Sequence, residues 1–184
     1  MYAVFGLGNP DKEYQNTRHN FGSLVIESLT KDLKLDWNEK AGYYCLRAET
    51  TINKHKVRFC RPQTYMNHSG QIVQNLVNYY KIPAKNIIIV YDDIDLPFGE
   101  IRVSVNKSSG GHKGIASIIE HLGSSDFNRV RLGIGPQTGK AENFVLKKFS
   151  SSQTKKLPEV IDIAKQAIIF LINEGLEKTA NKYN

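Results

Sequence analysis

The sequence has few of the features of secreted, metal-bound or membrane proteins. Its two cysteines, Cys45 and Cys60, are too few for a disulfide framework and lack metal-ligand spacing, so a reducing compartment is the simpler interpretation. No charged leader precedes the first apolar run, and the apolar stretch QAIIFLI near residue 170 is far shorter than the roughly 18 residues of a membrane span. We expect a cytoplasmic protein without membrane attachment.

The first loop lacks the third glycine of a dinucleotide-binding fingerprint. In the segment GLGNP, two glycines are followed by Asn9, Pro10 and Asp11, where a third glycine would lead into a helix. Pro10 also lacks the backbone N–H that a bound phosphate would use. We therefore expect no nucleotide cofactor, and we interpret the loop as the rim of a site that includes His19.

The composition indicates one basic domain. A chain of 184 residues that is 40% hydrophobic can bury one core, so we expect a single domain over residues 1–184. The net charge of +7 favours an anionic partner such as nucleic acid, although a merely basic soluble protein is the alternative. Basic residues are enriched in the second half, at Arg129, Arg131, Lys140, Lys147, Lys148, Lys155 and Lys156.

Strand-like and helical patterns alternate along the chain. Apolar runs predict strands at residues 2–5, 86–91 and 101–105, a hairpin from 43–49 and 56–61, and another strand from residue 130. Helical spacing predicts helices at residues 21–33, 69–80 and about 115–122. A long C-terminal helix, whose apolar stripe runs from residue 157 to 171, is expected to stop near Gly175. This alternation is typical of an α/β fold, in which ligands bind beyond the carboxyl ends of the strands. We expect the segments GLGNP, DDID and NKSSGGHKG to meet there.

His19 is the candidate general base, because imidazole titrates near neutral pH. Asp92, Asp93 and Asp95 follow the most apolar strand, and a carboxylate bonded to the imidazole would select its tautomer and stabilise its charged form. Two alternatives remain open from these residues alone. Either the histidine is structural and the aspartates are solvated turn residues, or the three carboxylates hold a divalent cation.

Other polar segments have both functional and structural interpretations. Asn9, Asn20 and Asn67 could donate hydrogen bonds to an oxyanion, but asparagine beside proline or glycine is usually a turn residue. The segment SSGGHKG could bind an anion at a helix start or form an ordinary flexible loop. Tyr65 and Met66 fit packing as well as ligand contact. The remaining histidines show no metal-ligand spacing, and we expect surface or loop positions for His55, His68, His112 and His121.

Several motifs together are much more specific than any one residue. GLGNP, YQNTRHNFG, RPQTYMNHSG, VYDDIDLPFG, GGHKGI, FNRVRLGIG and FVL resemble the ordered motifs of the bacterial peptidyl-tRNA hydrolase family and cover nearly the whole chain. The resemblance implies a single-domain α/β protein with a mixed twisted β-sheet flanked by helices. It also implies a monomeric, metal-independent enzyme without a cofactor. Such an enzyme cleaves the ester between a peptide and the 3′ ribose of tRNA, and so recycles tRNA from prematurely released peptidyl-tRNA.

The resemblance also assigns roles to individual residues. It implies that His19 activates water and that Asp92 orients and polarises His19. The residues that it implies for substrate binding are Asn9, Tyr65, Met66, Asn67, Gly110 and Lys113. Those that it implies for tRNA binding are Tyr14, Arg131, Lys107 and Arg102.

Three positions depart from the family pattern. Lys113 occupies the place of an asparagine, which leaves the role of that position open. Ser104 occupies the place of a lysine in the phosphate clamp, for which Lys107 or Arg102 could substitute. His68 occupies the place of a leucine, and the sequence offers no explanation for it.

Two other functions compete with the hydrolase. A non-catalytic RNA-binding module would use the basic face and aromatic residues such as Tyr65 to hold single-stranded ends. A metal-dependent phosphoesterase would use the DDID carboxylates. A relative of the same fold without hydrolase activity is a further alternative, although the presence of His19 and Asp92 argues against it.

Overall fold

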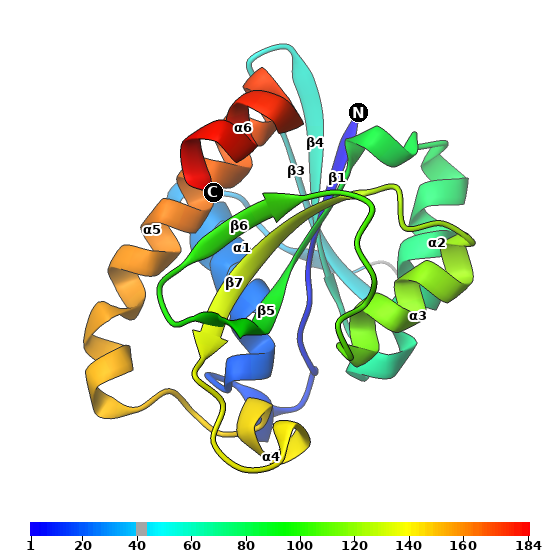
Figure 1. The fold of residues 1–184 in the computed structure, drawn as a ribbon. Helices are drawn as coiled ribbons and strands as arrows, with labels where there is room; N and C mark the ends of the chain where they lie inside the picture. The colour runs from blue at the N-terminus through cyan, green and yellow to red at the C-terminus, as the bar shows by residue number, and fades with distance from the viewer. Residues whose placement is uncertain (40–43) are drawn as a thin grey trace.

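The computed structural model describes residues 1–39 and 44–184 (Figure 1). Its strands are β1 (Tyr2–Gly6), β2 (Asn38–Glu39), β3 (Cys45–Ile52), β4 (His55–Pro62), β5 (Ile87–Pro97), β6 (Ile101–Ser104) and β7 (Asn128–Gly135). Its α-helices are α1 (Phe21–Asp32), α2 (Ser69–Tyr80), α3 (Lys113–Leu122), α4 (Ala141–Val145), α5 (Ser151–Glu174) and α6 (Leu176–Tyr183). Short 3₁₀ turns are η1 (Lys12–Tyr14), η2 (Arg18–Asn20), η3 (Met66–His68) and η4 (Ala84–Asn86).

The strands form one mixed sheet of seven strands in the order β2-β3-β4-β1-β5-β7-β6. The pairs β4–β1, β1–β5 and β5–β7 are parallel, whereas β3 pairs antiparallel with β4, and β6 antiparallel with β7. The predicted central strand is therefore β5, which lies between two parallel neighbours. A parallel strand between two helical layers is covered on both faces. For this reason the continuous apolar run of β5 correctly predicted a central strand.

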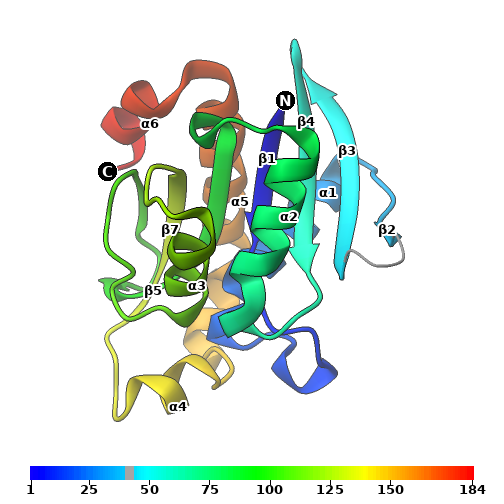
Figure 2. The same ribbon diagram turned by 90° about the vertical axis from the view of Figure 1, so that its right-hand side faces the viewer.

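Helices cover both faces of the sheet (Figure 2). Alternate residues of β5 point to opposite sides, so Ile88 and Val90 join a core with α1 and α5, whereas Ile87 and Ile89 join a core with α2 and α3. The α/β architecture with a mixed sheet and flanking helices is confirmed. In the described part of the chain, no helix is both long and apolar enough to cross a membrane.

Most predicted elements are confirmed, with several differences. The hairpin forms from β3 and β4, while residue 43 of its predicted first strand lies outside the described residues. Strand β5 continues through the DDID segment to Pro97, with an irregular register after Asp93, where we expected the strand to end. The short helices α4 and α6 were not predicted. Helix α5 also begins earlier than its apolar stripe indicated, because Ser150 and Gln153 form a capping box.

The start of α1 lies directly on the backbone of β5. A Cβ atom added at Gly22 would stand 2.0 Å from the carbonyl oxygen of Val90, so only glycine permits this approach. The amide of Ser23 donates a hydrogen bond to the carbonyl of Leu7, in the loop after β1. These contacts hold the turn before α1 at the carboxyl end of the central strands.

Candidate active site

Turn η2 carries His19 and is anchored by its neighbour Arg18. The Arg18 side chain is buried and donates to the backbone carbonyl of Lys148 at 2.8 Å and to the side-chain oxygen of Gln153 at 3.0 Å. Its guanidinium carbon lies 4.4 Å from the ring centroid of Phe144, a cation–π contact. Arg18 therefore joins η2 to α4 and to the start of α5.

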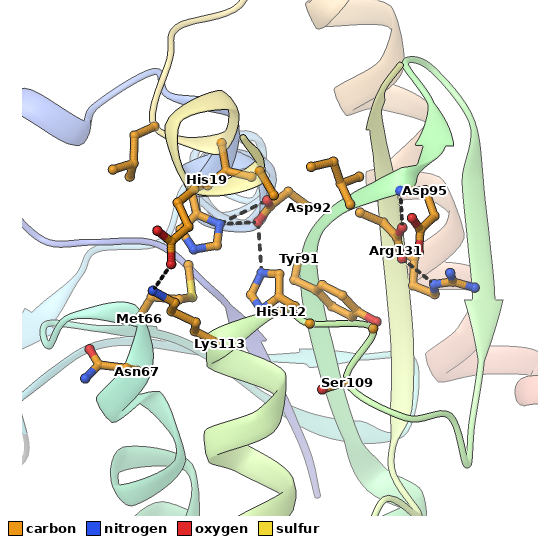
Figure 3. Close-up of a pocket in the computed structure, with 18 of the residues that line it drawn as sticks. His19, Met66, Asn67, Tyr91, Asp92, Asp95, Ser109, His112, Lys113 and Arg131 are labelled. Carbon is orange, nitrogen blue, oxygen red and sulfur yellow. Dashed lines mark hydrogen bonds and ion pairs between the residues drawn. The ribbon is translucent and has the colours of Figure 1, made fainter. Parts of the chain in front are cut away.

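Asp92 binds two imidazoles at once (Figure 3). The Nδ1 atom of His19 lies 3.0 Å from each carboxylate oxygen, and the Nε2 atom of His112 lies 3.1 Å from Oδ1. All three side chains are at least nine-tenths buried. The predicted pairing of His19 with one of the three aspartates is therefore present in the structure, and the partner is Asp92.

The hydrogen bonds of the two rings determine their tautomers. The backbone amide of Ile115 donates to Nδ1 of His112, so the neutral His112 ring carries its proton on Nε2 and donates it to Asp92. His19 presents Nδ1 to the same carboxylate, which places the proton of its neutral ring on Nδ1. Nε2 of His19 is then a lone-pair acceptor, as a general base requires.

The charge of Asp92 sets the ionisation of the site. Burial by itself would lower the pKa of His19, but the charge of Asp92 and its hydrogen bond outweigh burial and raise that pKa above its ordinary value of 6.5. Burial by itself would raise the pKa of Asp92, but the two histidines hold that pKa far below its ordinary value. The site is thus a carboxylate with two imidazole donors.

His112 lies at the end of the loop before α3, as expected, but its side chain is not on the surface. Its side chain is only 9% exposed, and its ring centroid lies 4.8 Å from that of His19. It is the N-cap residue of α3, and its ring accepts the Ile115 amide in place of the usual short polar side chain. The expectation that the DDID and NKSSGGHKG segments meet at one sheet edge was the signal that could have identified His112.

A network of asparagines shapes the GLGNP loop. The side chain of Asn20 accepts from the backbone N–H of Asn9 and donates to the carbonyl of Asn9, both at 2.9 Å. Oδ1 of Asn9 accepts the Met66 amide at 2.8 Å, and its Nδ2 has no hydrogen-bond acceptor among residues 1–39 and 44–184, which leaves this donor for a ligand. Asn20 is therefore a loop-forming residue, whereas Asn9 retains a donor beside His19.

These residues line a crevice of about 510 Å³ at the carboxyl edge of the sheet. Its wall includes most of the predicted substrate-binding and catalytic residues, namely Asn9, His19, Tyr65, Met66, Asn67, Asp92, Gly110 and Lys113. Exposed Tyr65 donates to Asp11 at 2.7 Å, and Nδ2 of Asn67 lies 3.2 Å from Nε2 of His68. His68 thus contacts a predicted substrate-binding residue.

The predicted tRNA-binding residues are divided between the crevice and other surfaces. Arg131 and Lys107 line the crevice, and Nε of Arg131 donates to Asp93 at 2.7 Å. Arg102 lies directly opposite Arg131 on β6, but its guanidinium contacts the carbonyl of Asn184 instead of the crevice. Tyr14 does not line the crevice either; it lies on η1, where the nearby charge of Glu13 raises its pKa.

A buried arginine supports the loop that borders the crevice. Arg129 is fully buried and donates to the backbone carbonyls of Ser108 and Lys107, at 2.7 Å and 2.5 Å. Ser104, which the resemblance aligns with a lysine of the family's phosphate clamp, lies opposite Arg129 in the β6–β7 pair. Lys107, whose backbone carbonyl accepts from Arg129, lines the crevice next to this buried arginine.

The carboxylates do not assemble as a cation cage. Within residues 1–39 and 44–184, one group of possible metal ligands is found, His19, Asp92 and His112, whose ligand atoms lie within 4.8 Å of one another. Asp93 and Asp95 are not part of it. Nδ1 of His19 and Nε2 of His112 already face the Asp92 carboxylate at hydrogen-bond distance. A cation bound by these three groups would require both N–H protons to leave. The two histidines and Asp92 therefore already meet one another's hydrogen-bonding needs as a triad.

Comparison with known proteins places this geometry in a family. The family model described as peptidyl-tRNA hydrolase matches residues 3–184. A peptidyl-tRNA hydrolase of Caldanaerobacter subterraneus is 44% identical, and one of Clostridium acetobutylicum is 41% identical, with the match covering all of this chain and 100% and 98% of those proteins. The crystal structure of peptidyl-tRNA hydrolase from Acinetobacter baumannii superposes with a TM-score of 0.93 at 32% identity, covering all of this chain and 94% of that chain. The chain belongs to the peptidyl-tRNA hydrolase family.

Proposed function

We propose that this protein hydrolyses the ester bond between a peptide, or an N-acyl amino acid, and the 3′ ribose of tRNA. The observation that carries the proposal is the His19–Asp92 pair, which leaves Nε2 of His19 as an acceptor in a crevice also lined by Asn9. Membership of the peptidyl-tRNA hydrolase family supplies the substrate class.

The reaction needs one base and a small number of donors. Nε2 of His19 takes a proton from a water molecule as its oxygen attacks the ester carbonyl, and Asp92 stabilises the imidazolium that forms. The free Nδ2 donor of Asn9 stabilises the negative charge on the carbonyl oxygen. The bond to the ribose 3′ oxygen then breaks, and His19 returns its proton to that oxygen. The products are a free peptide carboxylate and tRNA.

His112 is a positioning residue in this mechanism. Its Nε2–H donates to Oδ1 of Asp92, and its Nδ1 is held by the Ile115 amide. The His112 hydrogen bond fixes Oδ1 of Asp92, while Nδ1 of His19 lies within hydrogen-bond distance of both carboxylate oxygens. We infer that His112 keeps Asp92 ionised and oriented throughout the reaction, and that the step needs no metal ion or organic cofactor.

The other side of the crevice is suited to the tRNA. Arg131 uses its Nε for Asp93, and within the described part of the chain its two terminal nitrogens have no hydrogen-bond partner, so they are left for phosphate oxygens. Lys107 lies on the same wall and supplies the second cation in place of the absent clamp lysine. We include Arg102 and Tyr14 as outer tRNA contacts. We further propose that residues 1–184 act as one domain, as a cytoplasmic monomer.

The proposal is tested by measuring release of a labelled N-acyl amino acid from N-acyl-aminoacyl-tRNA. His19→Ala should lose about 10² to 10⁴ in rate, whereas wild-type turnover should persist with a chelator present. His55→Ala is the matched control, because His55 lies in the β3–β4 hairpin outside the crevice. Tight tRNA binding without wild-type turnover would instead indicate an RNA-binding module. Loss of turnover with the chelator would indicate a metal-dependent esterase.

A further inference from the structure

Lys113 connects two walls of the crevice that are distant in sequence. It is the first residue of α3, directly after His112, and its Nζ donates to Oε1 of Glu142 at 2.8 Å. Glu142 lies in the first turn of α4, and both residues line the crevice. In Figure 3 the dashed line from Lys113 marks this ion pair, on the same side of the crevice as Met66 and Asn67.

The two ends of α4 are held in different ways. Its C-terminal part is anchored by the buried Arg18, which contacts the Phe144 ring and the carbonyls after the helix. The segment 136–143 before and within its first turn is exposed and includes Gly139 at φ +73°. Among the hydrogen bonds and ion pairs of the described residues, only Lys113–Glu142 joins this segment to another element.

The ion pair lies on the side of the crevice that would receive the acyl group. Arg131 lies across the crevice from Lys113 (Figure 3), so a tRNA bound at Arg131 would leave the Lys113 end of the crevice to the peptide. The crevice lining includes apolar residues of α4 and the residue after it beside Glu142, namely Ala141, Val145 and Leu146. The position of α4 against the start of α3 therefore sets the width of the acyl side.

We propose that the Lys113–Glu142 ion pair determines which acyl groups this enzyme accepts. The pair keeps α4 close to α3, so a short N-acyl-aminoacyl ester binds with the pair intact, whereas a longer peptide must separate the two side chains. This inference rests on the proposed function. It gives Lys113, which replaces the family's asparagine, a role in selectivity.

The expected effect is modest, because both partners are exposed. The side chains of Lys113 and Glu142 are 63% and 74% accessible. Exposed ion pairs of this kind change an equilibrium by about 1.5-fold to 5-fold. Salt screens them, since the Debye length falls from about 10 Å at 0.1 M to about 3 Å at 1 M. The selectivity of the wild-type enzyme should therefore decrease at high ionic strength.

The test compares kcat/KM for a tRNA carrying an N-acetylated amino acid with kcat/KM for the same tRNA carrying a longer peptide. Glu142→Gln should raise the long-to-short ratio by about 1.5-fold to fivefold. The exchange of charges, Lys113→Glu with Glu142→Lys, should return the ratio toward the wild-type value. Both substrates are measured at one pH, so that any change in the basicity of His19 cancels from the ratio.

Glu159→Gln is the matched control, because it makes the same change at an exposed carboxylate of α5 that does not line the crevice and has no ion pair among the described residues. An unchanged ratio in Glu142→Gln, or an equal change in the control, would overturn the inference. Amide hydrogen exchange of residues 140–146 provides a readout independent of activity. It should be faster in Glu142→Gln and restored by the charge exchange. Absence of wild-type turnover on both esters would refute the proposed function, while the exchange data would still decide whether the pair holds α4.

Discussion

Replacing Asp92 by asparagine provides the most direct test of the site chemistry. The carboxylate accepts from both histidines through Oδ1, and His19 is equally close to Oδ2. Asparagine has one oxygen and one NH₂ group. Because the Ile115 amide holds His112 in its Nε2–H tautomer, the asparagine oxygen must occupy the Oδ1 position to satisfy that ring.

The NH₂ group of this variant then lies at the former Oδ2 position, 3.0 Å from Nδ1 of His19. There it favours the His19 tautomer with an unprotonated Nδ1, which places the proton on Nε2 and blocks the base. The variant also loses the negative charge that stabilises the imidazolium. An amide at the equivalent position of a serine-protease triad costs about 10⁴ in rate, so we expect Asp92→Asn to lose about 10² to 10⁴ in kcat.

The assay is single-turnover hydrolysis of N-acyl-aminoacyl-tRNA as a function of pH. The neutral His19 ring is the active form, so activity falls as the pH drops through its pKa. Removal of the Asp92 charge lowers that pKa, and the acidic limb should move to lower pH along with the loss in rate. Asp126→Asn is the control, since Asp126 is exposed and outside the crevice.

A rate within tenfold of wild type, in a variant with an unchanged circular dichroism spectrum, would refute the tautomer argument. An acidic limb that stays in place would refute the electrostatic argument separately. Adding His112→Ala to Asp92→Asn gives a stricter test. It frees the asparagine oxygen to face His19, so the double variant should be faster than Asp92→Asn alone.

Three further predictions concern tRNA binding, packing and ionisation. Arg131→Ala should weaken tRNA binding and reduce the slope of log K against log salt by about one, measured by fluorescence titration; an unchanged slope would remove Arg131 from the phosphate contacts. Gly22→Ala would place a methyl group 2.0 Å from the Val90 carbonyl and should destabilise the fold by about 3 kcal/mol in urea unfolding; a wild-type midpoint would contradict this packing. The charge of Lys113 opposes protonation of His19, so Lys113→Met should raise the pKa of His19 and move the acidic limb to higher pH; a shift to lower pH would contradict this.

Much of the fold was predictable from the sequence because the signals are local. The apolar run of β5 and the stripe of α2 reflect burial of one strand and one helix face, and each segment carries that pattern in its own residues. Helix α4 carries no such pattern. It is five residues long, and its main anchor is the Phe144 ring against Arg18, a contact between distant parts of the chain.

The site was predictable in part for the same reason. His19 and Asp92 follow recognisable loop and strand segments, and the rule that ligands bind beyond the carboxyl ends of strands brings them together. His112 was missed, because its function depends on two hydrogen bonds that no spacing in the sequence reveals. The contact of Lys113 with Glu142 was likewise invisible, since it joins an α3 residue to a helix that was not predicted.

The double role of the His112 ring has a practical consequence for spectroscopy. The Ile115 amide donates to Nδ1 of this ring, while the opposite nitrogen donates to Asp92. A displaced ring would remove the acceptor of the Ile115 amide. The ¹⁵N–¹H resonance of Ile115 is therefore a natural probe of how the His112 ring lies against Asp92, without any label near the substrate.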